Sequence, residues 1–231
     1  MSHAAFFDLD GTLLRGESQF SFLLWCLRRG VAPRLRALPV LAQYGSYLVG
    51  LSSNAVALRQ AGFRLLRGIP VRRIEHSAAE FFRADLSGRF RRNAVSLLEA
   101  HRANGDLVVV ITSACNLLAN LVGAHLQADA VLSTRLVVAD GVFTGSRELP
   151  EPYGDGKRIL VERFCMDRGL VPAECHAYAD HHSDTMLLEY VGHPVIVNPT
   201  RRLRSIAAKR GWPQVNLDAK ELPALLTREC A

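Results

Sequence analysis

Short runs of apolar residues alternate along most of the chain with longer stretches in which apolar residues recur at helical spacing. Continuous apolar runs are typical of strands buried on both faces of a parallel sheet. Such strands are predicted at residues 4–8, 107–111, 130–133, 176–179 and 194–197. Helices are predicted at residues 94–103, 117–126, 157–168, 184–191 and 201–210. This alternation predicts an α/β fold with a doubly wound parallel sheet.

One long block interrupts the alternation. Residues 15–92 show no strand pattern, and apolar residues such as Phe20 and Leu24 follow helical spacing there. We expect this block to be an α-helical cap inserted into a core of residues 1–14 and 93–231.

The most apolar stretch of the chain, residues 37–51, lies inside this block. It contains Pro39, Gln43 and Tyr44 and is shorter than the roughly 20 residues that a membrane span requires. It predicts a buried helix, with a contact to another subunit or to a membrane surface as the alternative. Outside the block, residues 136–145 predict a hairpin, because their Asp-Gly pair suits a type I′ turn.

Composition and charge narrow the class of protein. The 231 residues are 49% hydrophobic and 22% charged, which is typical of one compact domain, with or without an insertion. The net charge of +6 raises the question of nucleic-acid binding, but no nucleic-acid motif accompanies the arginines. Among these are the pairs at 28–29, 72–73 and 91–92, and the nearby aromatics Phe81, Phe82 and Phe90 fit the buried face of a helix. We expect a solvated basic surface, or a positive field that attracts a phosphorylated metabolite, without a nucleic-acid or membrane partner.

The cysteines favour a reducing compartment. Five of them stand far apart without a CxxC pair, so neither a disulfide framework nor a zinc site is predicted. The first residues enter an apolar run without the pattern of a signal peptide. We therefore expect a cytoplasmic protein, as a monomer or homodimer.

Polar residues follow the predicted strands. In an open parallel sheet, ligands bind beyond the carboxyl ends of the strands, so these residues are candidates for one site. They are Asp8, Asp10 and Thr12 after the first strand, Thr112 and Ser113 after the second, Asp180 and Asp184 after a later one, and Lys157 at the start of a helix.

These residue types suit phosphoryl transfer. A carboxylate nucleophile and a phosphate dianion repel each other, so the site needs a hard divalent cation with oxygen ligands, and Mg²⁺ fits. A lysine and a hydroxyl can hold the phosphoryl oxygens. A second carboxylate can protonate the leaving alcohol and later activate water.

Several motifs occur together in an order that resembles the haloacid dehalogenase-like phosphatases, in particular the subgroup that contains phosphoserine phosphatase. The similarity covers nearly the whole chain. The motifs are DLDGTLL at 8–14, VVVITS at 108–113, DGVFTG at 140–145, GDGK at 154–157, YADHHSD at 178–184 and VGHPVIVNP at 191–199. The resemblance implies a Rossmann-like core with a helical cap after the first strand.

The resemblance also implies roles for the catalytic residues. Asp8 would be the nucleophile and Asp10 the general acid and base. Thr112 would hold a phosphoryl oxygen, with Ser113 as the alternative hydroxyl, and Lys157 would bind phosphate and orient Asp8.

It further implies a magnesium site. Asp180 would be the metal ligand from the late loop, and Asp184 would support it. Asp8 and the carbonyl of Asp10 would complete the protein ligands. His181 and His182 lie in the same loop, but Mg²⁺ prefers oxygen, so we expect them to be exposed loop residues that could still touch substrate.

The substrate is less well defined. In phosphoserine phosphatases a Glu after the nucleophile motif binds the substrate ammonium, and Glu17 lies at the matching offset. The arginine that grips the serine carboxylate is replaced by Gly62, although Arg59 or Arg64 could substitute for it. An amine-bearing monoester such as histidinol phosphate or phosphoserine is therefore the hypothesis.

Three other hypotheses stay open at this point. A mutase of the same superfamily would use the same aspartyl-phosphate. A receiver-like phosphate-binding module would share the acids, the Thr and the Lys, but it has no helical cap. A basic nucleic-acid or membrane-surface protein with an inactive site would bind its partner in a salt-sensitive way.

Overall fold

The computed structural model describes residues 3–48 and 55–220. Within them, six parallel strands form one sheet in the order β3-β2-β1-β6-β7-β8. The strands are β1 (Ala4–Phe7), β2 (Leu107–Cys115), β3 (Ala130–Thr134), β6 (His176–Ala179), β7 (His193–Val197) and β8 (Gln214–Val215). The predicted doubly wound parallel sheet is confirmed.

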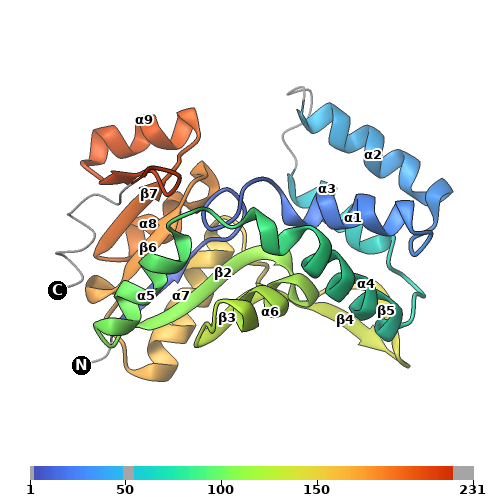
Figure 1. The fold of residues 1–231 in the computed structure, drawn as a ribbon, viewed down its shortest axis with the longest axis horizontal. Coiled ribbons are helices and arrows are strands. Elements are labelled where there is room, and N and C mark those ends of the chain that lie inside the picture. The colour runs from blue at the N-terminus through green and yellow to red at the C-terminus, as the bar shows by residue number, and fades with distance from the viewer. Residues whose placement is uncertain (1–2, 49–54, 221–231) are drawn as a thin grey trace.

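Helices cover both faces of the sheet (Figure 1). On one face, α5 (Ala94–Ala103) and α6 (Asn116–His125) pack against the side chains of Phe7, Val108 and Val110. On the other face lie α7 (Asp155–Arg168), α8 (Thr185–Tyr190) and α9 (Arg201–Arg210). Because successive side chains of a strand point to opposite faces, continuous apolar runs such as 107–111 supply both layers at once.

Most predicted elements have ends within one or two residues of those in the structure, but two differ in more than that. Strand β2 continues past residue 111 to Cys115, with an irregularity in its pairing to β3 between Thr112 and Cys115. The helix expected at 184–191 is a short 3₁₀ turn, η3 (His182–Asp184), followed by α8. In both places polar site residues lie inside the element, so hydrophobic periodicity alone marks its end poorly.

The block of residues 15–92 is helical where the structure describes it. It contains α1 (Ser18–Arg28), α2 (Arg34–Leu48), α3 (Ala55–Arg64), α4 (Val71–Ala84) and the 3₁₀ helix η1 (Leu86–Arg89). Helices α1 to α3 lie beyond one end of the sheet, to the upper right in Figure 1. A second small element, the antiparallel pair β4 (Leu136–Ala139) and β5 (Val142–Arg147), reaches the same region.

The hairpin has the predicted turn. Asp140 and Gly141 have φ values of 50° and 75°, the positive values that a two-residue type I′ turn requires. The N–H of Gly68 donates to the carbonyl of Phe143 at 2.8 Å, and the N–H of Phe143 donates to the carbonyl of Ile69 at 3.1 Å. We therefore propose that the hairpin belongs to the same structural unit as the cap helices, in addition to residues 15–92.

The prediction of a buried helix at residues 37–51 is wrong. Only Ala37 and Val40 are buried among the described side chains of α2, while Leu35 and Leu38 are 84% and 61% exposed. Only one face of α2 packs against the rest of the cap, so the high apolar content of this stretch did not indicate a helix buried on all sides. Residues 49–51 of that stretch lie outside the described part of the chain.

None of the described helices combines the length and apolar character needed to cross a bilayer. The four described cysteines, Cys26, Cys115, Cys165 and Cys175, are buried free thiols, as expected from their spacing. Cys230 lies outside the described residues.

Buried histidines make stability depend on pH. His176 is 8% exposed, and burial, then the neighbouring His101 and His193, lower its pKa from about 6.5 to about 4. Between pH 6.5 and about pH 4, the His176 side chain binds a proton in the unfolded chain but not in the folded protein. The free energy of unfolding therefore decreases as the pH falls through this range. We expect the free energy of unfolding to drop by about 3 kcal/mol from this group between pH 7 and pH 4.

Urea denaturation across this pH range tests the expectation. His176→Gln, which cannot titrate, should show a flatter acid dependence than the parent. An unchanged slope in the variant would contradict the assignment.

Candidate active site

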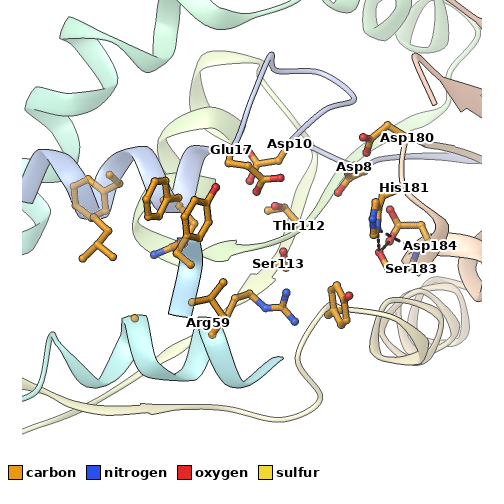
Figure 2. A pocket seen from close by; sticks show the side chains of 18 of the residues that line it. Asp8, Asp10, Glu17, Arg59, Thr112, Ser113, Asp180, His181, Ser183 and Asp184 are labelled. Atoms are coloured by element: carbon orange, nitrogen blue, oxygen red, sulfur yellow. Dashed lines mark hydrogen bonds between the residues drawn. The ribbon is translucent and has the colours of Figure 1, made fainter. Parts of the chain in front are cut away.

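The residues predicted for the site converge on one cavity of about 300 Å³ at the carboxyl ends of β1, β2 and β6 (Figure 2). Parallel strands bring their carboxyl ends to the same edge of the sheet, so residues far apart in sequence meet there. The predicted residues that line this cavity are Asp8, Asp10, Glu17, Thr112, Ser113, Lys157, Asp180 and Asp184.

Lys157 lies between two of the carboxylates. Its Nζ atom is 2.6 Å from Asp8 Oδ1 and 2.9 Å from Asp184 Oδ1, and the three residues are 3%, 6% and 2% exposed. Burial alone lowers the pKa of Lys157, but Asp184 and Asp8 together outweigh it and raise that pKa above its usual value. The lysine is therefore a fixed cation that holds the Asp8 carboxylate in place.

The acids are crowded. Oxygen atoms of Asp8, Asp180 and Asp184 lie within 4.8 Å of one another. Burial, then Asp8 and Asp184, raise the pKa of Asp180 to about 8, and burial also raises the pKa of Asp8. The close approach of the Asp180 side chain to the loop after β1 depends on Gly11. An added Cβ atom at Gly11 would stand 2.2 Å from Asp180 Oδ2, and the backbone there has a φ of +83°.

Asp10 faces the start of α1. Its two carboxylate oxygens accept hydrogen bonds from the backbone N–H and the hydroxyl of Ser18, both at 2.9 Å. Burial, then Glu17, raise the pKa of Asp10 to about 8. Glu17 as a whole residue is exposed at the cavity mouth. Its carboxylate, however, lies beside Asp10 in Figure 2. Burial of this carboxylate, and then the neighbouring Asp8, raise the pKa of Glu17.

The hydroxyl of Thr12 contacts Asp8, and Thr112 lines the same cavity. Thr12 donates to Asp8 Oδ2 at 3.2 Å and lies 3.5 Å from Asp180 Oδ1. Thr112 is fully buried, and its Oγ1 accepts the N–H of Ala114 at 3.1 Å, which leaves its own proton for another acceptor. The sequence pointed to Thr12 only as a polar residue after the strand, with no separate role.

Arg91 supports the loop that carries the acids. Its guanidinium donates two hydrogen bonds to the carbonyl of Gly11, at 3.1 and 2.7 Å, and forms an ion pair with Asp218. The expectation that the arginine pairs form a solvated face holds for Arg92 but is wrong for Arg91, which is half-buried. Sequence spacing gave no signal for this contact, because its partners lie 80 and 127 positions away.

The cap contributes an arginine to the opposite side of the cavity. The Nε atom of Arg59 donates to Glu151 Oε1 at 2.7 Å, and its guanidinium lies 3.8 Å from the ring centre of Tyr153. Among the described residues, its buried Nη2 atom has no hydrogen-bond partner. Figure 2 shows Arg59 across the cavity from Glu17.

The expectation that both histidines of the late loop are exposed is wrong, because His181 and His182 are half-buried. His181 lines the cavity, and its Nδ1 accepts the N–H of Ser183 at 3.2 Å. Burial, then His182, lower the pKa of His181 to about 4, so the ring is neutral.

The donor set fits a hard divalent cation. The carboxylates of Asp8, Asp180 and Asp184 supply oxygen ligands within a few ångströms of one another, and repulsion between these groups is part of what raises the pKa values of Asp8 and Asp180. Mg²⁺ prefers oxygen ligands of this kind and would relieve the repulsion.

Comparison with known proteins places the chain in a family. Residues 5–189 match the haloacid dehalogenase-like hydrolase family. The chain belongs to the haloacid dehalogenase-like hydrolases. This hydrolase has the α/β fold that its motifs indicated, with helices inserted between β1 and β2. Its family and its relatives support phosphatase activity.

Three relatives and one solved structure illustrate the similarity. The hydrolase is 34% identical over 214 residues to the inhibition of morphological differentiation protein of Streptomyces azureus, covering 91% of this chain and 76% of that one. It is 31% identical over 220 residues to a phosphoserine phosphatase of Mycobacterium tuberculosis, covering 92% and 70%. It is 24% identical over 234 residues to a histidinol-phosphatase of Neisseria meningitidis, covering 94% and 99%. A Bordetella pertussis protein of unknown function superposes with a TM-score of 0.84 at 26% identity, covering 94% and 99%.

Proposed function

We propose that this hydrolase is a Mg²⁺-dependent phosphatase that transfers the phosphoryl group of a small monoester to Asp8 and then to water. The observation that carries the proposal is the position of the Asp8 carboxylate. It faces the cavity, is held by Lys157, and shares its surroundings with two further acids, Asp180 and Asp184.

The first step forms an aspartyl-phosphate. A carboxylate oxygen of Asp8 attacks phosphorus while the bond from phosphorus to the ester oxygen breaks. Asp10, two residues further along the same loop and in the same cavity, gives a proton to the leaving alcohol. Its two hydrogen bonds from Ser18 hold the carboxyl in one orientation.

The second step releases phosphate. Asp10, now a carboxylate, takes a proton from a water molecule that attacks the same phosphorus, and the bond to Asp8 breaks. Lys157 and the hydroxyl of Thr112, with Ser113 beside it, bind the phosphoryl oxygens during both steps. Mg²⁺, held by Asp8, the Asp10 carbonyl and Asp180 with Asp184 in support, would supply charge neutralisation.

The metal part of the proposal can be tested without an activity assay. A ligand that binds only the folded state at 100 times its Kd stabilises it by about 2.7 kcal/mol. For a chain of this length, we expect saturating MgCl₂ to raise Tm by roughly 5 to 10 °C relative to EDTA. Asp180→Asn should lose most of the shift, and NaCl at equal ionic strength should not produce it. An equal shift in Asp180→Asn would contradict the ligand assignment.

The proposed substrate carries an amine close to the phosphate. Glu17 places a carboxylate at the mouth of the cavity, and the relatives include enzymes named for phosphoserine and for histidinol phosphate. A carboxylate that contacts an ammonium group discriminates through a charge-assisted hydrogen bond.

Paired substrates test the role of Glu17. Purified protein with Mg²⁺ should hydrolyse phosphoethanolamine with a kcat/KM about tenfold above that for ethyl phosphate, and Glu17→Gln should remove most of this preference. Glu162→Gln is the matched control, because Glu162 lies on α7 outside the cavity and its side chain is 42% exposed. Equal preferences in the parent and in Glu17→Gln would refute the role.

A further inference from the structure

The cap side of the cavity is apolar. We call this part the cap chamber and define it by the side chains that line it: Phe20, Phe22, Leu23 and Cys26 of α1, Val40 and Tyr44 of α2, Leu58 of α3, and Leu66. Burial raises the pKa of Cys26 to about 12, so its thiol stays uncharged and belongs with the apolar lining. The acids Asp8, Asp180 and Asp184 lie at the other end of the same cavity in Figure 2.

Part of this lining is not simply the core of the cap. Phe22 and Val40 are buried, but Phe20, Leu23 and Leu58 stay only partly buried where they line the cavity. A small, wholly polar phosphate ester at Asp8 would leave these side chains facing water. Apolar surface that a protein keeps inside a pocket is typical of a site that binds apolar ligand atoms.

Polar groups mark the boundary between the two ends. Glu17 lies on one side and Arg59 on the other, and Glu151 and Tyr153 hold the arginine from outside the chamber. Among the described residues, the Arg59 Nη2 atom has no acceptor, so a substrate oxygen can supply one. A ligand with phosphate at Asp8 and a polar middle would therefore extend its far end into the cap chamber.

We propose that the substrate is a phosphate monoester whose alcohol carries an apolar group of several carbon atoms, and that the cap chamber binds this group. The inference rests on the proposed phosphatase function and adds the substrate class. Transfer of one methylene from water to an apolar site improves binding roughly fourfold. The value of kcat/KM should therefore rise with the length of the apolar group until the chamber is full.

A homologous series of n-alkyl phosphates tests this directly. With purified protein and Mg²⁺, we expect kcat/KM to increase on the order of 100-fold from ethyl through butyl to hexyl phosphate. Release of phosphate at equal rates from all three esters overturns the inference and leaves the phosphatase function standing. If neither the three alkyl esters nor p-nitrophenyl phosphate releases phosphate, the proposed function is overturned and this inference with it.

Gly62 allows the chamber to be narrowed without disturbing the core. It lies in α3 and lines the cavity, and an added Cβ atom there would meet no described atom within 4 Å. We expect Gly62→Leu to reduce the hexyl-to-ethyl ratio of kcat/KM at least tenfold, because the new side chain occupies the space for the alkyl group. Helical glycine weakens a helix, so this change should not unfold the protein.

Gly45→Leu is the matched control. Gly45 lies in the neighbouring helix α2, is exposed, does not line the cavity, and also has no described atom within 4 Å of an added Cβ. It should keep the chain-length dependence of the parent. An unchanged ratio in Gly62→Leu, or an equal loss in both variants, would show that the chamber does not bind the alkyl group.

Discussion

Asp8→Asn is expected to lower kcat for a phosphate monoester by at least about 1000-fold, equivalent to about 4 kcal/mol of barrier, while the protein stays folded. The amide is nearly the size of the carboxylate but is a poor nucleophile. Lys157 keeps its contact with Asp184 at 2.9 Å, so the substitution leaves no unpaired cation. Phosphate release in the presence of Mg²⁺, with Tm measured alongside, checks both parts.

A matched change elsewhere separates chemistry from general damage. Asp167→Asn alters an exposed aspartate in α7, outside the cavity, and should leave kcat within twofold of the parent. Rapid quenching of the parent with substrate should place a phosphoryl group on the peptide that contains Asp8, and Asp8→Asn should show none. Residual activity within about tenfold of the parent would rule out Asp8 as the nucleophile.

Lys157→Met is expected to cost both activity and stability. The change leaves the carboxylates of Asp8 and Asp184 buried together without the cation between them. Removing one partner from a buried ionic cluster typically costs about 3 to 5 kcal/mol of unfolding free energy. Urea denaturation in EDTA should show this loss, and kcat/KM should fall at least about 100-fold, because a donor to the phosphoryl oxygens is gone.

A double variant shows whether repulsion is the cause. If the carboxylates of Asp8 and Asp184 repel each other in Lys157→Met, adding Asp8→Asn should recover at least about 1 kcal/mol of unfolding free energy. In the parent, Asp8→Asn by itself should not increase the unfolding free energy. Lys209→Met, at an exposed lysine in α9, is the control and should change little. A loss below about 1 kcal/mol in Lys157→Met would mean that the cluster contributes no more than an exposed ion pair.

The sheet was predictable because its strands are continuous apolar runs, and such runs have few alternatives to burial between two layers of helices. The helix at 94–103 and the strand at 176–179 have the bounds that their patterns predicted. The hairpin turn was predictable from one dipeptide, since Asp-Gly tolerates positive φ at both positions. The burial of helix α2 was not predictable, because a high apolar content does not show how many faces of a helix will be covered.

The acids of the site could be named in advance because residues that follow parallel strands meet at one edge of the sheet. Their contacts could not. The 2.6 Å contact between Lys157 and Asp8 joins positions 149 apart, and Arg91 reaches Gly11 from a helical block with no site motif of its own. The roles of these residues in catalysis remain predictions that the experiments above address.

The sequence by itself determined the class of fold and the chemical types at the rim, since hydrophobic periodicity and strand ends act over a few residues and can be read locally. Tertiary structure alone decided which acids crowd together, that Arg59 is held by Glu151 with one nitrogen unpaired among the described residues, and that an apolar chamber adjoins the acids. These features depend on packing between segments far apart in the chain, where a few ångströms separate a salt bridge from no contact at all.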